Sequence, residues 1–380
     1  MSAIPRRPVL DWSWFGPSEE SALPSVGDLP HQQLLTSGRA ALYQALQQLL
    51  PSPRQHVLVP SFHCPTMVSP IVQAGLQPEF YALAANGLPD IDRLNPDALA
   101  VVAFHPFGLT QSMAVLRAWC DRHGVALIED CAHALFGHAG ERPVGTWGDY
   151  ATASLTKFLP VPEAGLLASN RHPLRPIALQ APSLAAQLRG WVDLLETAAQ
   201  SERLPGANAL LGLRARLRQQ PNTAALPVSH QTELTVAQAL RRTDMGRHSH
   251  QTVKAARWLA RLRPRARDVA QRRTNFACYA QAFDALPGAG RPLGLPQQGD
   301  APYAYPLMIE CAERAEAVYQ QARLYKLPVF RWDRVWPGAD ALKDDAGQPW
   351  RDQVLQLLCH ASLRLEDVAL TRKVLLDALH

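Results

Sequence analysis

Between residues 37 and 170, short apolar runs alternate with segments whose apolar residues recur at helical spacing. This spacing predicts helices over residues 37–50, 64–75 and 112–124. Apolar and β-branched runs predict strands over residues 56–60, 78–83, 98–104, 125–131, 149–155 and 165–170. Strands that alternate with helices, several of them apolar at consecutive positions, are typical of a mostly parallel sheet covered on both faces. The sequence therefore predicts a three-layer α/β/α fold.

The pattern changes toward both ends of the chain. Residues 1–35 are rich in Pro, Ser and Trp and predict an irregular lead-in segment. From about residue 251, helical stretches surround two further apolar runs, 301–310 and 327–332, which we expect to be strands. A chain of 380 residues is longer than one compact core usually serves. We therefore predict a large α/β domain over 1–250 and a smaller α+β domain over 251–380.

The first candidates for a functional site are the residues that directly follow the predicted strands. Ligands of open parallel sheets bind at the carboxyl ends of the strands. These positions are residues 61–64, 105–108, 130–133 and 154–157.

Composition indicates an ordinary globular protein. Hydrophobic residues make up 47% of the chain and charged residues 19%, as in most globular domains. No apolar run approaches the ~18 residues of a membrane span, and residues 1–16 lack the pattern of a secretory signal. We therefore expect a cytoplasmic protein that does not enter a membrane. The six cysteines are scattered without a CxxC pair, which favours reduced thiols over disulfides or a zinc site.

The net charge of +5 leaves two interpretations open. Some of the positive charge lies in the run RLRPRARDVAQRR, residues 261–273. Such a run can bind nucleic acid, or it can be a solvated helix and turn. We favour the second interpretation and expect no nucleic-acid partner, because no interleaved aromatic residues or known nucleic-acid motif accompany the run. A basic enzyme can also use this charge to attract phosphorylated substrates.

Lys157 is the only lysine in residues 1–253 of a chain that otherwise uses arginine. Arginine cannot lose its proton, whereas a partly buried lysine can and then acts as a nucleophile or base. Lys157 also follows a predicted strand. This pattern indicates a functional amine, although an ordinary exposed loop lysine would look the same.

Two further features suit a phosphorylated, electron-accepting cofactor. Asp130 ends a buried strand, where a carboxylate needs a partner such as a pyridinium nitrogen; a helix cap or a metal ligand is the alternative. We expect no metal, because Glu129 would point to the opposite face of the strand and His133 alone is not enough. The turn SGRAAL, residues 37–42, opens a helix whose amides can hold a phosphate, although a plain Ser37 cap is the commoner arrangement.

Taken in order, these motifs resemble one known family. The segments SGRAALYQAL, VLVPSFHCPTMVSPIVQAG, VVAFHPFG, VALIEDCAHALFG, VGTWGDYATASLTKFLP and EAGLLASN are similar to the DegT/DnrJ/EryC1/StrS aminotransferases. The resemblance covers roughly residues 35–170 and returns in residues 353–375, which are similar to the family's closing strand and last helix. It implies pyridoxal 5′-phosphate (PLP) as cofactor and the fold type I of PLP-dependent transferases.

The resemblance assigns roles around the cofactor ring. Lys157 would hold the cofactor as an imine and move protons, and Asp130 would pair with the pyridine nitrogen. His133 would lie near the phenolic oxygen. In the family, a second aromatic residue after the strand at 56–60 usually stacks on the ring, and this chain has Cys64 there. His63 and the neighbouring Phe62 are the other candidates for that contact.

The resemblance also places the cofactor's phosphate, and the smaller domain offers candidates for substrate binding. Gly38 and Arg39 would supply backbone N–H groups to the phosphate, and Thr152 or Ser154 a hydroxyl; Gly165 matches a small residue after the lysine. Two substrate candidates lie in the smaller domain, one inside the predicted strand 327–332 and one after a further predicted strand. They are Arg331, for a carboxylate or phosphate, and His360, in the cleft; a structural arginine and a core histidine are the alternatives.

The implied activity is transfer of an amino group from a donor such as glutamate to a keto sugar, often nucleotide-linked, or to a related small ketone. Such enzymes serve polysaccharide or secondary-metabolite biosynthesis and work as homodimers with the site at the interface. The family's Asn-Tyr-Arg element, which reaches the neighbouring subunit's phosphate, is not evident, and PVSHQTELTVAQ lies roughly there. Alternatives are another PLP reaction (dehydration, racemisation or condensation) and a non-catalytic relative.

Overall fold

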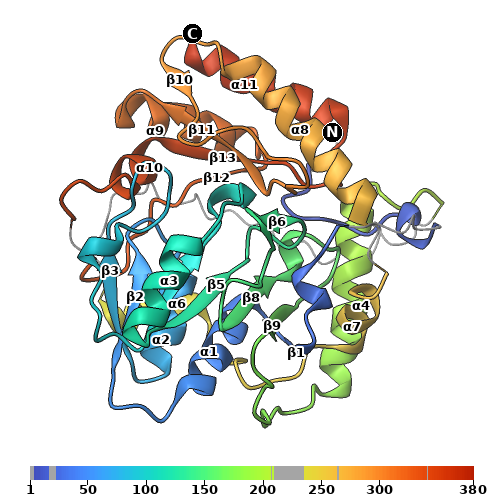
Figure 1. The fold of residues 1–380 in the computed structure, drawn as a ribbon. Helices are drawn as coiled ribbons and strands as arrows, with labels where there is room; N and C mark the ends of the chain where they lie inside the picture. Colours follow the sequence, from blue (N-terminus) through green and yellow to red (C-terminus); the bar gives the residue numbers. More distant parts are fainter. Residues whose placement is uncertain (1–3, 17–22, 207, 209–234, 263–264, 340) are drawn as a thin grey trace.

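A computed structural model describes residues 4–16, 23–206, 208, 235–262, 265–339 and 341–380. Figure 1 shows two layers of sheet, with the larger sheet in the lower part of the view and a smaller sheet with its helices above it. Among the described residues, no helix combines the length and the apolar character needed to cross a membrane.

The larger sheet has seven strands within the described residues, in the order β1-β9-β8-β5-β4-β2-β3. The strands are β1 (His31–Leu35), β2 (His56–Pro60), β3 (Gln77–Tyr81), β4 (Ala100–Phe104), β5 (Ala126–Asp130), β8 (Tyr150–Ser154) and β9 (Gly165–Ser169). Strand β9 runs antiparallel to both of its neighbours, and the other strands are parallel to one another. The mostly parallel α/β sheet predicted from the alternation of apolar runs is thereby confirmed.

Local sequence explains where the first helices begin and end. Helix α1 (Gly38–Leu49) starts after Ser37, whose hydroxyl accepts a hydrogen bond from the Ala40 amide at 3.2 Å. Helix α2 (Pro65–Gln73) begins with proline, which has no amide hydrogen to leave unpaired. Helix α3 (Ala114–His123) ends at Gly124, whose φ of 63° lies in the left-handed region that glycine tolerates. All three predicted helices are confirmed to within two residues.

Apolar side chains cover both faces of the larger sheet. In β9, Leu167 belongs to the main buried cluster together with residues of α1, such as Ala41. Its neighbours Leu166 and Ala168 point to the opposite face and join a second cluster. That cluster includes residues of α4 (Leu184–Gln200) and α7 (Lys254–Leu259), which pack against each other. The strand is therefore buried on both sides, as its continuous apolar sequence predicts.

The second sheet has four antiparallel strands within the described residues, in the order β10-β11-β13-β12. They are β10 (Ala289–Gly290), β11 (Ala304–Ile309), β12 (Val329–Phe330) and β13 (Val354–Leu358). The helices around it are α8 (Arg265–Phe283), α9 (Ala312–Leu324), α10 (Gly347–Gln353) and α11 (Leu365–Leu379). The other elements are α6 (Val236–Thr243), the β6–β7 pair (His138–Ala139, Arg142–Pro143) and the 3-10 turns at Trp12–Phe15, Val26–Asp28, Ile91–Arg93, Pro106–Gly108 and Leu155–Lys157.

Two features differ from the sequence expectation or refine it. Strand β1 lies in the segment expected to be irregular. The sequence does not predict this strand because HQQLL lacks an alternation of apolar and polar residues. The strand pairs with β9 at the edge of the sheet. Packing changes between α7, which contacts α4, and α8, which contacts β11 and α11. The domain boundary at residue 250 stays a prediction.

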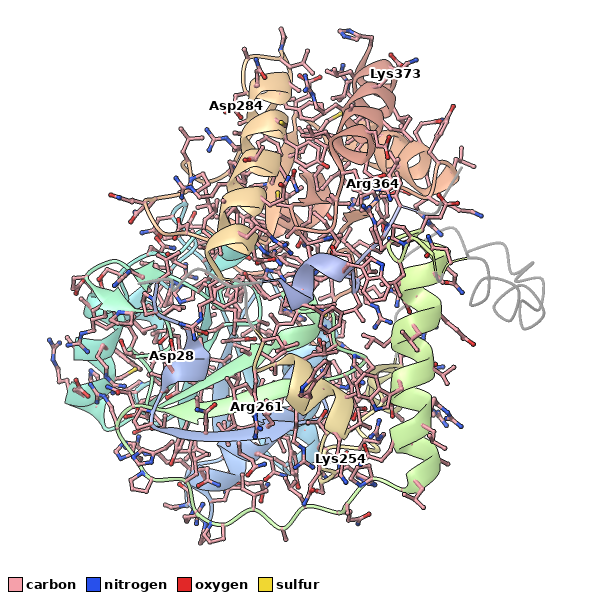
Figure 2. All side chains as sticks on the ribbon, turned by 90° about the vertical axis from the view of Figure 1, so that its right-hand side faces the viewer. Asp28, Lys254, Arg261, Asp284, Arg364 and Lys373 are labelled. Carbon is pink, nitrogen blue, oxygen red and sulfur yellow. The ribbon has the colours of Figure 1, made fainter. Side chains whose placement is uncertain are left out.

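The basic run at 261–273 does not form one charged face. Arg265 forms a two-point ion pair with Asp28, and Arg272 is completely buried. Arg267 donates to the Ser13 carbonyl oxygen at 3.2 Å. Figure 2 labels Arg261, an exposed residue, on the side of the molecule that also carries α4. The described arginines of the run therefore point in different directions and bind mostly to the protein itself.

The start of α1 lies against the start of β9 so closely that only glycine fits at position 165. A Cβ atom there would overlap the carbonyl oxygen of Ser37. We predict that Gly165→Ala lowers the free energy of unfolding by about 1–3 kcal/mol, the usual cost of overpacking. Urea denaturation measures this change. Gly294→Ala is the matched control, because no atom lies within 4 Å of a Cβ at that position. Equal stability of the two variants would contradict the close approach.

Candidate active site

A cavity of about 400 Å³ lies at the carboxyl ends of the parallel strands. Residues that follow four different strands line it, as the sequence predicts for an open parallel sheet. These residues are Cys64 after β2, His105 after β4, Asp130, Ala132 and His133 at and after β5, and Ser154, Thr156 and Lys157 at and after β8. The four candidate segments are thus brought to one place.

Lys157 follows β8 in a single 3-10 turn and lines the cavity. Burial lowers the pKa of its ammonium group, and the nearby Cys64 and Asp130 oppose that change. The Nζ atom lies 5.2 Å from the centre of the Tyr303 ring. A buried amine with a lowered pKa exchanges its proton more readily than a surface lysine, which is the property that the chain's preference for arginine elsewhere suggested.

A buried arginine fixes the backbone at Lys157. The Nη2 atom of Arg272, in α8, donates to the Lys157 carbonyl oxygen at 3.0 Å. The same guanidinium pairs with Asp268 at 2.6 Å and lies 4.2 Å from the centre of the Phe158 ring. Arg272 therefore ties the helices of the second sheet to the turn that carries the amine. Sequence reasoning placed this arginine in a surface run and missed it.

Asp130 ends β5 and faces the cavity. Its Oδ1 atom accepts hydrogen bonds from the Ala132 amide at 2.9 Å and the Thr152 hydroxyl at 3.5 Å. Burial raises the pKa of this carboxyl group, and the Ala132 hydrogen bond and Lys157 act in the other direction. The side chain is therefore held in place while its charge remains incompletely neutralised, so it favours a cationic ligand.

The neighbouring Glu129 points to the other face of β5, as the period of a strand requires. Its carboxylate accepts hydrogen bonds from the amides of Gly145, Trp147 and Gly148, and lies 3.0 Å from His105 Nε2. With His105 and Cys131 it forms the single group of three metal-ligand-type side chains found among the described residues. Both carboxylate oxygens of Glu129 already accept hydrogen bonds from backbone amides. We therefore interpret this group as a structural hydrogen-bond network.

His133 presents two unused hydrogen-bonding atoms to the cavity. The side chain is buried, and neither ring nitrogen has a hydrogen-bond partner in the described part of the chain. Its ring stacks on Tyr303 at 4.1 Å and lies 5.1 Å from the Trp332 ring. Burial lowers the pKa of His133 well below its usual value, so the imidazole is neutral at physiological pH. Buried nitrogens without partners indicate a place for a polar ligand.

The other end of the cavity is formed by the first turn of α1. Ser37, Gly38 and Arg39 line it, together with Ser154. A Cβ atom at Gly38 would lie 3.2 Å from the Ser154 Cβ, so glycine keeps this end open. The Arg39 guanidinium turns to the Asp244 carbonyl oxygen at 2.9 Å. Thr152 is buried and its hydroxyl contacts Asp130. Of the two candidate hydroxyl groups, the one that lines the cavity is therefore that of Ser154.

Like Thr152, three further candidates lie outside the residues that line the cavity. His63 is buried against the Pro60 and Ser61 carbonyl oxygens and accepts a hydrogen bond from the Trp336 amide at 3.1 Å. Arg331 pairs with Glu316 and donates to the Asp352 carbonyl oxygen at 2.6 Å. His360 lies 3.0 Å from the Pro5 carbonyl oxygen. These contacts are the structural alternatives that the sequence left open for Arg331 and His360, and their role in the site has no support from the geometry.

Several lining residues were not identified from the sequence. Trp332 follows Arg331 directly, and in extended chain the two side chains point to opposite sides. The segment around Arg247 comes from residues far from the predicted strands. Local patterns do not show that these positions line the cavity, because tertiary packing brings them there, although several of them, such as Met67, Phe104 and Glu163, lie inside segments that carry the family resemblance. These positions are Thr36, Thr66, Met67, Phe104, Pro162, Glu163, Asp244, Met245, Arg247, His248 and Trp332.

Comparison with known proteins identifies the family. The family model described as "DegT/DnrJ/EryC1/StrS aminotransferase family" matches residues 25–218. GDP-perosamine synthase from Vibrio cholerae is 32% identical over 192 residues, which are 48% of this chain and 52% of that protein. A dTDP-4-dehydro-2,3,6-trideoxy-D-glucose 4-aminotransferase from Saccharopolyspora spinosa is 29% identical over 40% of this chain and 43% of that protein. The chain spans about half the length of the curated relatives that it matches.

Solved structures share the fold. An aminotransferase from Streptoalloteichus hindustanus superposes with a TM-score of 0.61 at 20% identity, covering 92% of this chain and 86% of that one. A sugar aminotransferase from Micromonospora echinospora gives 0.59 at 17% identity over 98% of both chains. These likenesses confirm the predicted fold type I. With the matching model spanning more than half of its length, the chain belongs to the DegT/DnrJ/EryC1/StrS aminotransferase family.

Proposed function

We propose that the protein is a PLP-dependent aminotransferase that moves an amino group from an amino-acid donor such as glutamate to a keto sugar, often nucleotide-linked, or a related small ketone. The observation that carries this proposal is the cavity in which a partly buried lysine, Lys157, lies near a partly buried carboxylate, Asp130. Two relatives support the substrate class, since one is named a perosamine synthase and the other a deoxysugar aminotransferase.

The lining residues fit PLP, the cofactor of this family. The phosphate would bind at the amides of the first turn of α1, beside Ser154, where a helix N-terminus favours an anion. The ring nitrogen would meet Asp130, and the unpartnered His133 nitrogens suit the phenolic oxygen. Lys157 would hold the aldehyde carbon. Orphaned nitrogens and a glycine-lined helix start are hard to explain without such a ligand.

The chain's own groups then have distinct tasks. When bound, the cofactor supplies an electron sink for the pair left on the donor's Cα after deprotonation. Lys157 Nζ, with its lowered pKa, takes that proton and later returns one. Asp130 keeps the proton on the ring nitrogen, because a cation beside this carboxylate relieves the cost of its burial. Neutral His133 contributes a hydrogen bond without adding charge.

Other PLP reactions would use the same lysine and aspartate, so residues alone do not separate dehydration, racemisation or condensation from transamination. The relatives favour transamination, because those named above make or aminate sugars. A non-catalytic relative would have no reason to keep a buried amine of lowered pKa. A cytoplasmic location stays a prediction.

We also propose that two copies assemble into a homodimer with the site near the interface, as the family resemblance implies. Light scattering of the purified protein should give twice the mass of one 41.8 kDa chain. A single-chain mass at micromolar concentration would contradict this assembly.

The buried amine should make the cofactor-free protein less stable. Because the folded-state pKa of Lys157 lies below its ordinary value of 10.5, the unfolded chain binds the proton more readily. We predict that cofactor-free Lys157→Met is more stable than the wild type at pH 7, by on the order of 1 kcal/mol. The difference should shrink as pH rises through 10.5, because the amine is neutral in both states only above that value. Urea denaturation at several pH values measures it; Lys254→Met, an exposed site, is the control and should show no such trend.

A single half-reaction tests the proposed chemistry. Protein loaded with PLP should lose its visible absorbance when given an amino donor alone, and one keto acid should appear per site. Lys157→Met should show neither change. If the protein binds PLP but no amino acid converts it to the pyridoxamine form, transamination is ruled out and another PLP reaction takes its place. If no visible band forms at all, the cofactor assignment itself is wrong.

A further inference from the structure

The segment between α6 and α7 closes one side of the cavity. Asp244, Met245, Arg247 and His248 all line it. The segment is tied to α1 and to the residue two positions before it through backbone carbonyl groups. The Thr36 hydroxyl donates to the Arg247 carbonyl oxygen at 2.8 Å, Arg39 to that of Asp244 at 2.9 Å, and Gln44 to that of His248 at 3.3 Å. Hydrogen bonds thus anchor the backbone of this segment, and the Arg247 side chain lines the cavity.

The Arg247 guanidinium forms a two-point ion pair with Glu163. Nη1 contacts Oε2, and Nη2 lies 3.3 Å from Oε1. Glu163 belongs to the loop that follows Lys157, and it also lines the cavity. The ion pair therefore connects the turn that carries the amine with the segment that closes the cavity.

The two partners are not held equally. The Glu163 side chain is 16% exposed and also accepts hydrogen bonds from the Val253 amide at 3.0 Å and the Thr252 hydroxyl at 3.3 Å. The Arg247 side chain is 43% exposed, and within the described residues Glu163 is the single partner of its guanidinium. Losing the pair would leave Glu163 bonded but Arg247 without a partner. An ion pair this exposed contributes little stability and exchanges readily with other anions.

Arg39 is already engaged by the carbonyl oxygen and carboxylate of Asp244. Of the two described arginines that line the cavity, Arg247 is therefore the one whose guanidinium binds a side-chain carboxylate at two points. Another anion can replace that carboxylate. The planar fork of a guanidinium matches a carboxylate or a phosphate at two points.

We propose that Arg247 is the residue that binds the oxyanion of an incoming substrate, and that this oxyanion takes the place of Glu163. The inference rests on the proposed function for the identity of the substrate. Its chemistry is a carboxylate or phosphate group, which comes either from the amino-acid donor or from a nucleotide-linked acceptor. Glu163 acts as the internal competitor that occupies the guanidinium in the empty cavity.

The competition gives two charge-removing substitutions opposite effects. Glu163→Gln keeps an oxygen for Val253 and Thr252 but frees Arg247, so it should tighten oxyanion binding by about 3- to 10-fold. Arg247→Gln should weaken binding about 10-fold or more, and Arg247→Lys should fall between, because lysine keeps the charge but lacks the fork. A purely structural ion pair would make both Gln variants equally harmful to stability and would not move their affinities in opposite directions.

Calorimetric titration of PLP-loaded protein tests this, with glutarate as a probe for the donor and uridine diphosphate as a probe for the acceptor. The arm whose affinity changes in opposite directions in the two Gln variants identifies the source of the oxyanion. Arg241→Gln and Glu141→Gln, two exposed positions that do not line the cavity, make matched charge changes and should leave both affinities unchanged.

Three results would overturn the proposal. The first is that Glu163→Gln fails to tighten either probe, and the second is that neither probe binds the wild type. The third is that Arg247→Gln loses PLP while its affinity for both probes stays unchanged, which would assign Arg247 to the cofactor phosphate. The visible band of each variant is recorded in parallel. If the wild type shows no visible band, the proposed function is wrong. If the band is intact but the affinities of the variants are unchanged, only the inference about Arg247 is wrong.

Discussion

The burial of an amine and a carboxylate in one cavity is the constraint that the surrounding structure has to satisfy. Partial burial of Lys157 and Asp130 disfavours the charge of both, so it lowers the pKa of the amine and raises the pKa of the carboxyl group. Neighbouring groups hold the two side chains in place. Arg272 binds the backbone at Lys157, and the Ala132 amide binds Asp130. A local arrangement that lowers the stability of the fold is typical of a functional site.

The antiparallel strand β9 determines how closely the start of α1 approaches the rest of the site. Its first residue, Gly165, lies against the Ser37 carbonyl group, and Gly38 lies against Ser154. These approaches bring the amides of α1 to the end of β8, one turn before Lys157. The spacing between the first turn of α1 and Lys157 therefore depends on two glycines, Gly38 and Gly165, that lie more than a hundred residues apart in sequence.

Local patterns in the sequence were enough to predict the sheet and much of the site. Apolar runs such as 125–131 predict buried strands, and the rule that ligands bind at strand ends then selects Asp130, His133 and Lys157. The same reasoning fails where tertiary contacts decide. Arg331 and Trp332 are adjacent in sequence, and the packing of the second sheet turns the tryptophan, not the arginine, to the cavity. Arg247 reaches the cavity through hydrogen bonds to α1, which no spacing along the chain reveals.

The central claim is that Lys157 carries the cofactor, and one mass spectrum tests it most directly. PLP-loaded protein is reduced with borohydride, which makes the bond between lysine and cofactor permanent, and is then digested. The account predicts the added pyridoxyl phosphate mass on the peptide that contains Lys157, and unmodified peptides for Lys254, Lys326, Lys343 and Lys373. An unmodified Lys157, with the mass on another lysine or on none, would contradict it.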